Sequence, residues 1–240
     1  MRNLFSFFLN KKSDLIPSYF YNKTVLVTNC YHPVAREIIY YLSNNLNKNI
    51  RFVLIGKHPA FVSYIEKKII DRNDYKIERK KYVLSFSIDS RNYFHIKKAF
   101  KIIKSEWDKI DFIFHFDDYY FHKSILDLPV HNFKYLQQWN QLSFFNIIKA
   151  HQIFIQNPIR ILTIQNNNKQ TLYYHFRKSF IDFLKENQYS VSTLILNDNI
   201  INISSQKPKK RFLKQKIIDK SQVENIINQF IKEKSTITIN

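Results

Sequence analysis

A chain of 240 residues with 45% hydrophobic side chains can bury a full core, and its length suits a single large domain. No apolar run approaches the roughly 20 residues that cross a bilayer, so the composition argues against a membrane-spanning protein. The net charge of +19 raises nucleic acid as a partner, but no zinc-finger, basic-zipper or RNA-binding signature accompanies it.

Strand-like and helix-like segments alternate along the chain. Short runs rich in β-branched and aromatic residues, typical of strands buried on both faces, lie at 24–28, 51–55, 82–88, 110–116, 159–164 and 191–196. Segments with helical spacing of apolar residues lie at 33–46, 59–70, 92–107, 132–151, 172–186 and 221–232. In the last of these, Ser221 to Glu224 has the pattern of a capping box.

This alternation predicts an α/β fold, a doubly wound and mostly parallel sheet with helices on both faces. We expect residues 1–22 to form an N-terminal extension and residues 23–240 to form one Rossmann-type domain. Sheets of this kind bind ligands at the carboxyl ends of their strands, where the strand order reverses.

Tyr174 and Lys178 stand four residues apart in the predicted helix 172–186. This spacing places a phenol and an ammonium group on one helical face, where the positive charge lowers the pKa of the phenol. Such a pair suits a proton donor to a carbonyl oxygen. The histidines, in contrast, have no metal-ligand spacing, and we expect no metal site.

Further candidate residues lie at the ends of the predicted strands and within a predicted helix. Lys57 follows the second strand, Asp89 follows the third, the fourth begins Ile-Asp-Phe-Ile-Phe at 110–114, and Asn140 lies within a helix. In this order and spacing the chain resembles the short-chain dehydrogenase/reductase family over about residues 23–196.

The resemblance implies roles for these residues. Tyr174 would donate the proton, Lys178 would lower its pKa and hold the cofactor ribose, and Asn140 would hold a water that relays protons. Asp89 would contact the adenine of the cofactor, NADP or NAD, and Lys57 would favour the 2′-phosphate of NADP.

The phosphate-binding loop departs from the family pattern. By resemblance, the cofactor would be held by Thr28, Asn29, Pro33 and Val34, within the family's Thr-Gly-x-x-x-Gly-x-Gly loop. Here residues 28–35 read Thr-Asn-Cys-Tyr-His-Pro-Val-Ala, and every glycine is gone. Glycine provides positive φ and close backbone approach to the pyrophosphate. Asn29 tolerates positive φ, whereas Pro33 removes a backbone N–H.

Two other family motifs also differ. The Asn-Asn-Ala-Gly segment after the fourth strand reads His-Phe-Asp-Asp at 115–118, and the catalytic Ser is missing. An amide such as Asn166 would have to replace the Ser hydroxyl in polarising the substrate oxygen.

Two functions therefore remain open. The first is an NAD(P)(H)-dependent oxidoreductase acting on a small carbonyl or alcohol substrate. The second is a catalytically inactive pseudoenzyme that serves as a scaffold or complex subunit. The retained Tyr, Lys and Asn favour the first function, and the altered phosphate contacts favour the second.

Charge and cysteine content give the remaining expectations. Lys far outnumbers Arg and the positive charges are scattered, so we attribute them to the residue usage of an AT-rich genome and expect no nucleic-acid partner. Cys30 is the only cysteine, which suits a reducing compartment, the cytoplasm or an organellar matrix. The resemblance also implies a homodimer or homotetramer, paired through the helices that bear Asn140 and Tyr174.

Overall fold

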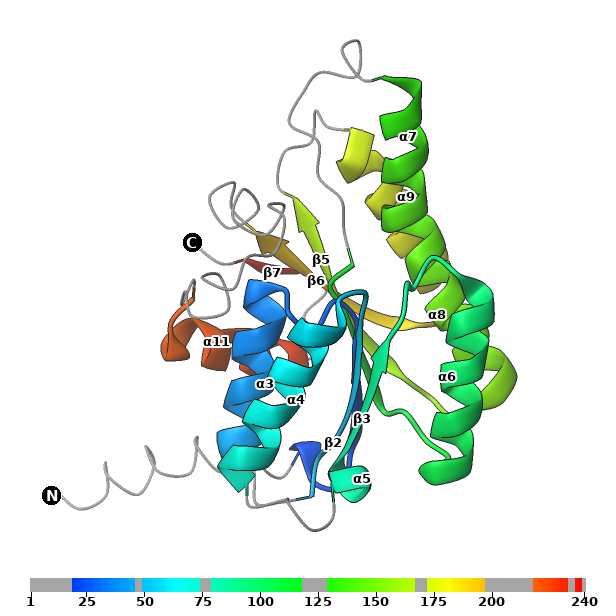
Figure 1. Ribbon diagram of the computed structural model, residues 1–240. Coiled ribbons are helices and arrows are strands. Elements are labelled where there is room, and N and C mark those ends of the chain that lie inside the picture. Colours follow the sequence, from blue (N-terminus) through cyan, green and yellow to red (C-terminus); the bar gives the residue numbers. More distant parts are fainter. Residues whose placement is uncertain are drawn as a thin grey trace, which may run out of the picture.

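In the described part of the chain, the strands form one seven-stranded sheet. The computed structural model describes residues 19–45, 49–73, 79–117, 129–166, 172–196, 218–232 and 236–238. The strands pair in parallel in the order β3-β2-β1-β4-β5-β6-β7 (Figure 1). Their bounds are β1 Thr24–Val27, β2 Arg51–Gly56, β3 Val83–Ser87, β4 Phe112–His115, β5 Arg160–Asn166, β6 Ser190–Leu196 and β7 Thr236–Thr238.

Helices cover both faces of the sheet (Figure 1). Alternate residues of each strand point to opposite faces, so Val25 and Val27 join one core cluster and Leu26 the other. The first cluster lies under α3 (Pro33–Asn45), α4 (Pro59–Asn73) and α11 (Lys220–Ile231). The second lies under α6 (Tyr93–Glu106), α8 (Ser143–Phe154) and α9 (Leu172–Glu186). The predicted doubly wound α/β fold is therefore confirmed.

The elements follow the predicted ones with three differences. The predicted helix 132–151 is instead α7 (Val130–Gln137), a π-helical turn η2 (Gln138–Leu142) and α8. The short helix α5 (Arg79–Tyr82) and strand β7 were not predicted, because three or four residues carry too little periodicity to be recognised.

The cap of the last helix was predicted two residues too late. Asp219 is the N-cap of α11, because its carboxylate accepts a hydrogen bond from the Gln222 amide at 2.8 Å. The Gln222 side chain accepts one from the Asp219 amide in return, at 2.9 Å, which completes the capping box.

The chain start contributes to the core. Phe20 is fully buried and its ring packs against Phe112 and Phe114 of β4, with ring centroids 4.9 and 6.4 Å away. The first 18 residues of the predicted extension lie outside the described residues. None of the helices in the described ranges is long and apolar enough to cross a membrane.

The strand order reverses between β1 and β4. From β1 the sheet grows outward through β2 and β3, and from β4 through β5, β6 and β7. The segments that follow β1 and β4 therefore meet at the carboxyl edge of the sheet, which is the ligand-binding position of such folds. Residues 28–32 and 115–117 form this meeting point.

Candidate functional site

Thr28 joins the two segments at the strand-order reversal. Its hydroxyl oxygen accepts hydrogen bonds from the backbone amides of Phe116 at 3.1 Å and Asp117 at 3.3 Å. The same oxygen lies 3.1 Å from Nδ1 of His115. Thr28 is fully buried, and its hydroxyl group joins the ends of β1 and β4 from inside the fold.

Asn29 adopts the left-handed backbone conformation, with φ of 44°, at the first lost glycine of the family loop. Asn is among the few residues that tolerate this region. Its side-chain amide donates a hydrogen bond to the Phe116 carbonyl at 3.2 Å. The loop thus keeps a glycine-like backbone turn at Asn29, and the Asn29 side chain connects this loop to the segment that follows β4.

His32 occupies the start of helix α3. Its Nδ1 accepts a hydrogen bond from the Val34 amide at 3.3 Å, and its ring stacks on Phe116 with centroids 5.4 Å apart. The side chain is 2% exposed, and burial together with the charge of Arg36 lowers the pKa of its imidazole to about 3. The ring is therefore neutral. Pro33, the first residue of α3, has no amide hydrogen to offer.

Tyr31 packs against the end of β2. Its ring lies 5.6 Å from both the His58 and the Phe61 ring, measured between centroids. A Cβ atom at Gly56 would come within 2.8 Å of Cε1 of Tyr31 and within 2.9 Å of Cγ2 of Val62. Gly56 is the only glycine of the chain, and it stands where this aromatic side chain meets the strand backbone.

Asp117 and Arg177 are buried together beside β4. Nη2 of Arg177 donates a hydrogen bond to the Asp117 carbonyl at 2.5 Å, and the Arg177 side chain is fully buried. Burial raises the pKa of the Asp117 carboxyl to about 6, although a hydrogen bond from Ser90 and the charge of Arg177 oppose this rise. The ring of His115 stacks on Phe144 of α8 at 4.2 Å between centroids.

Asp89 and Lys57 lie together at the ends of β3 and β2. Nζ of Lys57 is 3.9 Å from a carboxylate oxygen of Asp89, and Lys57 is about half exposed. Arg91 binds the same carboxylate through its side chain and its backbone amide. Burial raises the pKa of Asp89, but the hydrogen bonds and charge of Arg91 and the charge of Lys57 outweigh it and hold this pKa below its usual value.

The four predicted catalytic residues lie on three elements. Asn140 is in the π-helical turn η2, Asn166 ends β5, and Tyr174 and Lys178 are in α9. The side chains of the first three lie outside the described residues. Lys178 is exposed.

Arg177 was missed by the reading of the sequence. The buried face of α9 carries Ile181 and Leu184, and Arg177 precedes them by one helical turn. This spacing of four and three residues is the signal that identifies position 177 as inward-facing. Among the described residues, no three His, Cys, Asp or Glu side chains are grouped so as to hold a metal ion.

The residues at the crevice do not fit a nicotinamide dinucleotide in the family's manner. A pyrophosphate needs free amides and close backbone approach at the helix start. Here Pro33 lacks the hydrogen, Val34 donates to His32, and the His32 and Tyr31 rings stand in the loop that glycines would leave open.

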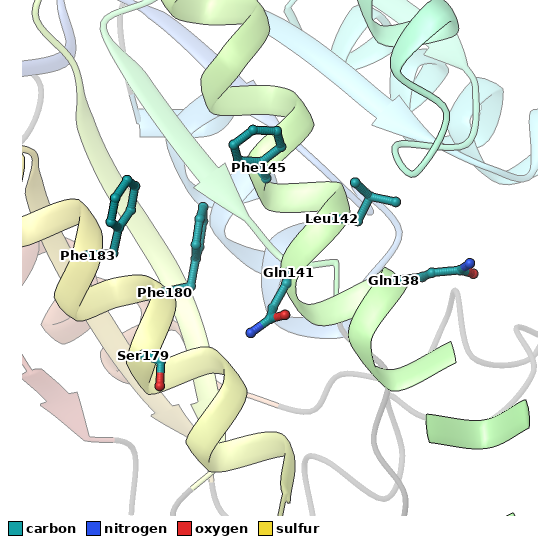
Figure 2. A pocket seen from close by; sticks show the side chains of 7 residues that line it. All are labelled: Gln138, Gln141, Leu142, Phe145, Ser179, Phe180 and Phe183. Atoms are coloured by element: carbon teal, nitrogen blue, oxygen red, sulfur yellow. The ribbon is translucent and has the colours of Figure 1, made fainter. Parts of the chain in front are cut away.

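A hollow lies between α9 and the helix formed by η2 and α8 (Figure 2). It has a volume of about 500 Å³. Uncharged side chains line it, namely Gln138, Gln141, Leu142, Phe145, Ser179, Phe180 and Phe183. Phe145 and Phe183 are 44% and 50% exposed, so the hollow opens on an apolar surface.

Comparison with known proteins places the fold. No protein-family model and no curated protein sequence matches the chain. Among solved structures, it is similar to a short chain dehydrogenase/reductase from Burkholderia phymatum in complex with NAD, with a TM-score of 0.70 and 9% identity over 91% of this chain and 89% of that one.

Two further structures agree. An alcohol dehydrogenase from Thermococcus sibiricus complexed with 5-hydroxy-NADP has a TM-score of 0.69 and 11% identity, over 90% of this chain and 95% of that one. A glucose/ribitol dehydrogenase from Brucella melitensis has a TM-score of 0.67 and 13% identity, over 92% and 96%. The predicted resemblance is thus confirmed at the level of the fold, and this chain has the Rossmann-type fold of the short-chain dehydrogenases/reductases.

Proposed function

We propose that this protein keeps the short-chain dehydrogenase/reductase fold without its dinucleotide chemistry, and that it acts as a scaffold or complex subunit. The observation that carries this proposal is the position of His32. Its neutral ring accepts a hydrogen bond from the Val34 amide and stacks on Phe116. The His32 side chain therefore uses an amide at the start of α3 that would otherwise bind an anion.

Two further observations support a filled crevice. Tyr31 packs against Gly56 at the end of β2, next to the Lys57 and Asp89 pair that would face the adenosine. Asp117, which replaces the small Ala of the family motif, is buried and held by Arg177. Opening this site for a dinucleotide would therefore require several packed side chains to move at once.

Cofactor titration tests the proposal. The purified protein is titrated with NADPH and NADH while nicotinamide fluorescence and the thermal midpoint are followed. A cofactor at 100 times its dissociation constant would stabilise the fold by about 2.7 kcal/mol. We expect no shift at millimolar cofactor, and a saturable shift would contradict the proposal.

A paired variant makes a negative result informative. His32→Ala frees the Val34 amide and removes a ring from the crevice, so we expect it to bind NADPH or NADH more tightly than the natural chain does. His95→Ala, which removes an exposed imidazole from α6, is the matched control and should change nothing. If both variants behave alike, His32 does not block the site.

The π-helical turn favours a second candidate function. Turns of this kind are rare in proteins, and those that occur are often at functional sites. Here the turn contains Asn140, the counterpart of the family's catalytic Asn. The second candidate is an NAD(P)(H)-dependent oxidoreductase acting on a small carbonyl or alcohol. In it Tyr174 would donate the proton, Lys178 would lower its pKa, and Asn166 would polarise the substrate oxygen.

Turnover separates the two candidates. If a cofactor binds, Tyr174→Phe should leave that binding intact and abolish turnover, because it removes only the phenolic hydroxyl. Equal turnover in both proteins would exclude Tyr174 as the proton donor. A homodimer or homotetramer remains a prediction from the resemblance, and light scattering of the purified protein measures it.

A further inference from the structure

Exposed apolar side chains gather on one side of the molecule. Among the described residues, every large apolar side chain that is strongly exposed to solvent, except Tyr21, lies on the segments from α6 to α9. These are Phe94, Ile102, Val130, Phe133, Leu142, Phe145, Ile153 and Phe183. The helices α3, α4 and α11, on the other face of the sheet, have none in this set.

Two neighbouring helices repeat one pattern on this side. On α6, Phe94, Lys98 and Ile102 follow one another at intervals of four residues, and on α8 Phe145, Lys149 and Ile153 do the same. Residues four apart share a helical face, so each helix presents a Phe-Lys-Ile row. The four apolar side chains are 44–59% exposed. We call these two rows the Phe-Lys-Ile surface.

The two rows lie beside each other. α6 and α8 both return the chain to the start of a strand of the same parallel sheet, so they run in the same direction (Figure 1). The Asn146 side chain ties the start of α8 to the start of α6, because it donates hydrogen bonds to the carbonyls of Ser90 and Arg91 at 3.0 and 2.9 Å. The two helices are therefore neighbours, and Lys149 of the α8 row reaches the Tyr93 ring at the start of α6.

Lysines on this surface lie close to its aromatic rings. Nζ of Lys98 is 4.3 Å from the centroid of the Phe94 ring, and Nζ of Lys149 is 5.7 Å from that of Phe145 and 5.0 Å from that of Tyr93. In this arrangement the alkyl stem of lysine covers apolar surface while the ammonium group remains available to anions.

The surface is strongly basic. The exposed charged residues of α6 and α8 are five lysines and one glutamate, namely Lys97, Lys98, Lys101, Lys104, Lys149 and Glu106. The whole chain has a net charge of +19, which adds long-range attraction to any anionic partner. Large apolar side chains interleaved with lysines are the features that interfacial membrane-binding helices present.

We propose that the Phe-Lys-Ile surface binds the surface of an anionic phospholipid bilayer. The four apolar side chains would enter the boundary between headgroups and acyl chains, and the lysines would contact the lipid phosphates and carboxylates. This inference does not depend on whether the crevice binds a cofactor.

Charge argues against a second copy of the chain as the occupant. Two such surfaces facing each other would bring the five lysines of each copy together, with only Glu106 and Asp108, the ion-pair partner of Lys104, to offset them. The protruding Phe and Ile side chains also argue against a nucleic-acid duplex, whose backbone offers charged phosphates and little apolar surface.

Vesicle flotation tests the proposal with the full chain. One set of vesicles contains phosphatidylcholine alone, and the other contains phosphatidylcholine mixed with phosphatidylserine. We expect binding to the second set only, with loss of binding at high salt. Each lysine near an anionic surface contributes roughly a fivefold change in partitioning, so Lys98→Gln with Lys149→Gln should weaken binding about 25-fold.

Matched variants on other parts of the molecule control for net charge and for apolar exposure. Lys67→Gln with Lys68→Gln removes the same charge from α4, on the opposite face of the sheet, and should weaken binding far less. Phe94→Ser with Ile153→Ser should weaken binding roughly tenfold or more, whereas Tyr21→Ser should not. Thermal unfolding confirms that each variant folds.

Four results would overturn the proposal. The first is no binding to anionic vesicles at low salt, and the second is equal weakening by the two lysine pairs. The third is tighter binding to duplex DNA than to vesicles, lost in the Lys98→Gln and Lys149→Gln protein. The fourth is a stable dimer that Phe94→Ser with Ile153→Ser dissociates, since that would assign the surface to a second copy.

Discussion

Gly56→Ala tests the packing that fills the crevice. The added methyl group would lie 2.8 Å from Cε1 of Tyr31 and 2.9 Å from Cγ2 of Val62, closer than real Cβ contacts. The strand cannot withdraw, because Gly56 pairs with Ser87 of β3 and its carbonyl accepts the Ile88 amide at 2.9 Å. Val62 is buried, and the Tyr31 ring is in contact range of His58 and Phe61.

The size of the effect follows from two opposing contributions. Replacing glycine by alanine at a compatible site stabilises a protein by about 0.4–1 kcal/mol, because the unfolded chain loses freedom. Inserting a methyl group into a packed site costs about 1–3 kcal/mol. Since both neighbours are closer than 3.0 Å, we expect the second contribution to prevail and the free energy of unfolding to fall by about 1–2 kcal/mol.

Urea unfolding followed by circular dichroism measures this change in a double-mutant cycle with Tyr31→Ala. Removing the ring should relieve part of the clash, so the cost of Gly56→Ala should drop by about 1 kcal/mol in that background. The contact with Val62 remains, and relief should be incomplete. A Gly56→Ala protein as stable as the natural one, or an equal cost with and without the ring, would refute the proposed packing of Tyr31 on the strand.

Three other predictions concern buried and capping groups. Acidification from pH 6.5 towards pH 4 should lower the free energy of unfolding, because the unfolded chain takes up protons at three histidines whose pKa burial lowers in the fold: His32, His115 and His151. Asp117 opposes this, since burial raises its pKa from 3.8 to about 6 and the folded carboxyl gains a proton in this range; Asp117→Asn should steepen the loss by up to about 1.4 kcal/mol per pH unit, and an unchanged slope in urea unfolding would contradict this. Thr28→Val should cost about 1–3 kcal/mol in the same assay, because two buried amides lose their acceptor, whereas the exposed control Thr236→Val should cost little. Asp219→Ala should cost about 1 kcal/mol through loss of the α11 cap, and an equal cost for Ser221→Ala would argue for the cap predicted from the sequence.

Much of the fold is legible in the sequence because it depends on local patterns. Runs such as Arg51–Gly56 contain β-branched and apolar residues that suit a strand buried on both faces, and Leu172–Glu186 has the period of a helix packed on a sheet. The alternation of such strands and helices indicates a parallel sheet covered by helices. The elements α5 and β7, which were not predicted, contain only four and three residues, too few to show a repeating pattern of apolar side chains.

The candidate site was only partly legible. The resemblance predicted that Thr28, Asp89 and Lys57 lie around the crevice. Residue types alone, however, do not say where a side chain points. The position of Arg177 inside the fold and of Lys178 outside it depends on how α9 rotates against the sheet.

The sequence by itself determined the alternation of the six longer strands with helices, and it revealed that the glycines of the phosphate-binding loop are gone. Only the tertiary structure decided what took their place: His32 bonded to Val34 and stacked on Phe116, and Tyr31 seated on Gly56. The physical reason is that these contacts join residues from different strands, loops and helices. Their distances are fixed by the packing of the whole sheet and not by any spacing along the chain.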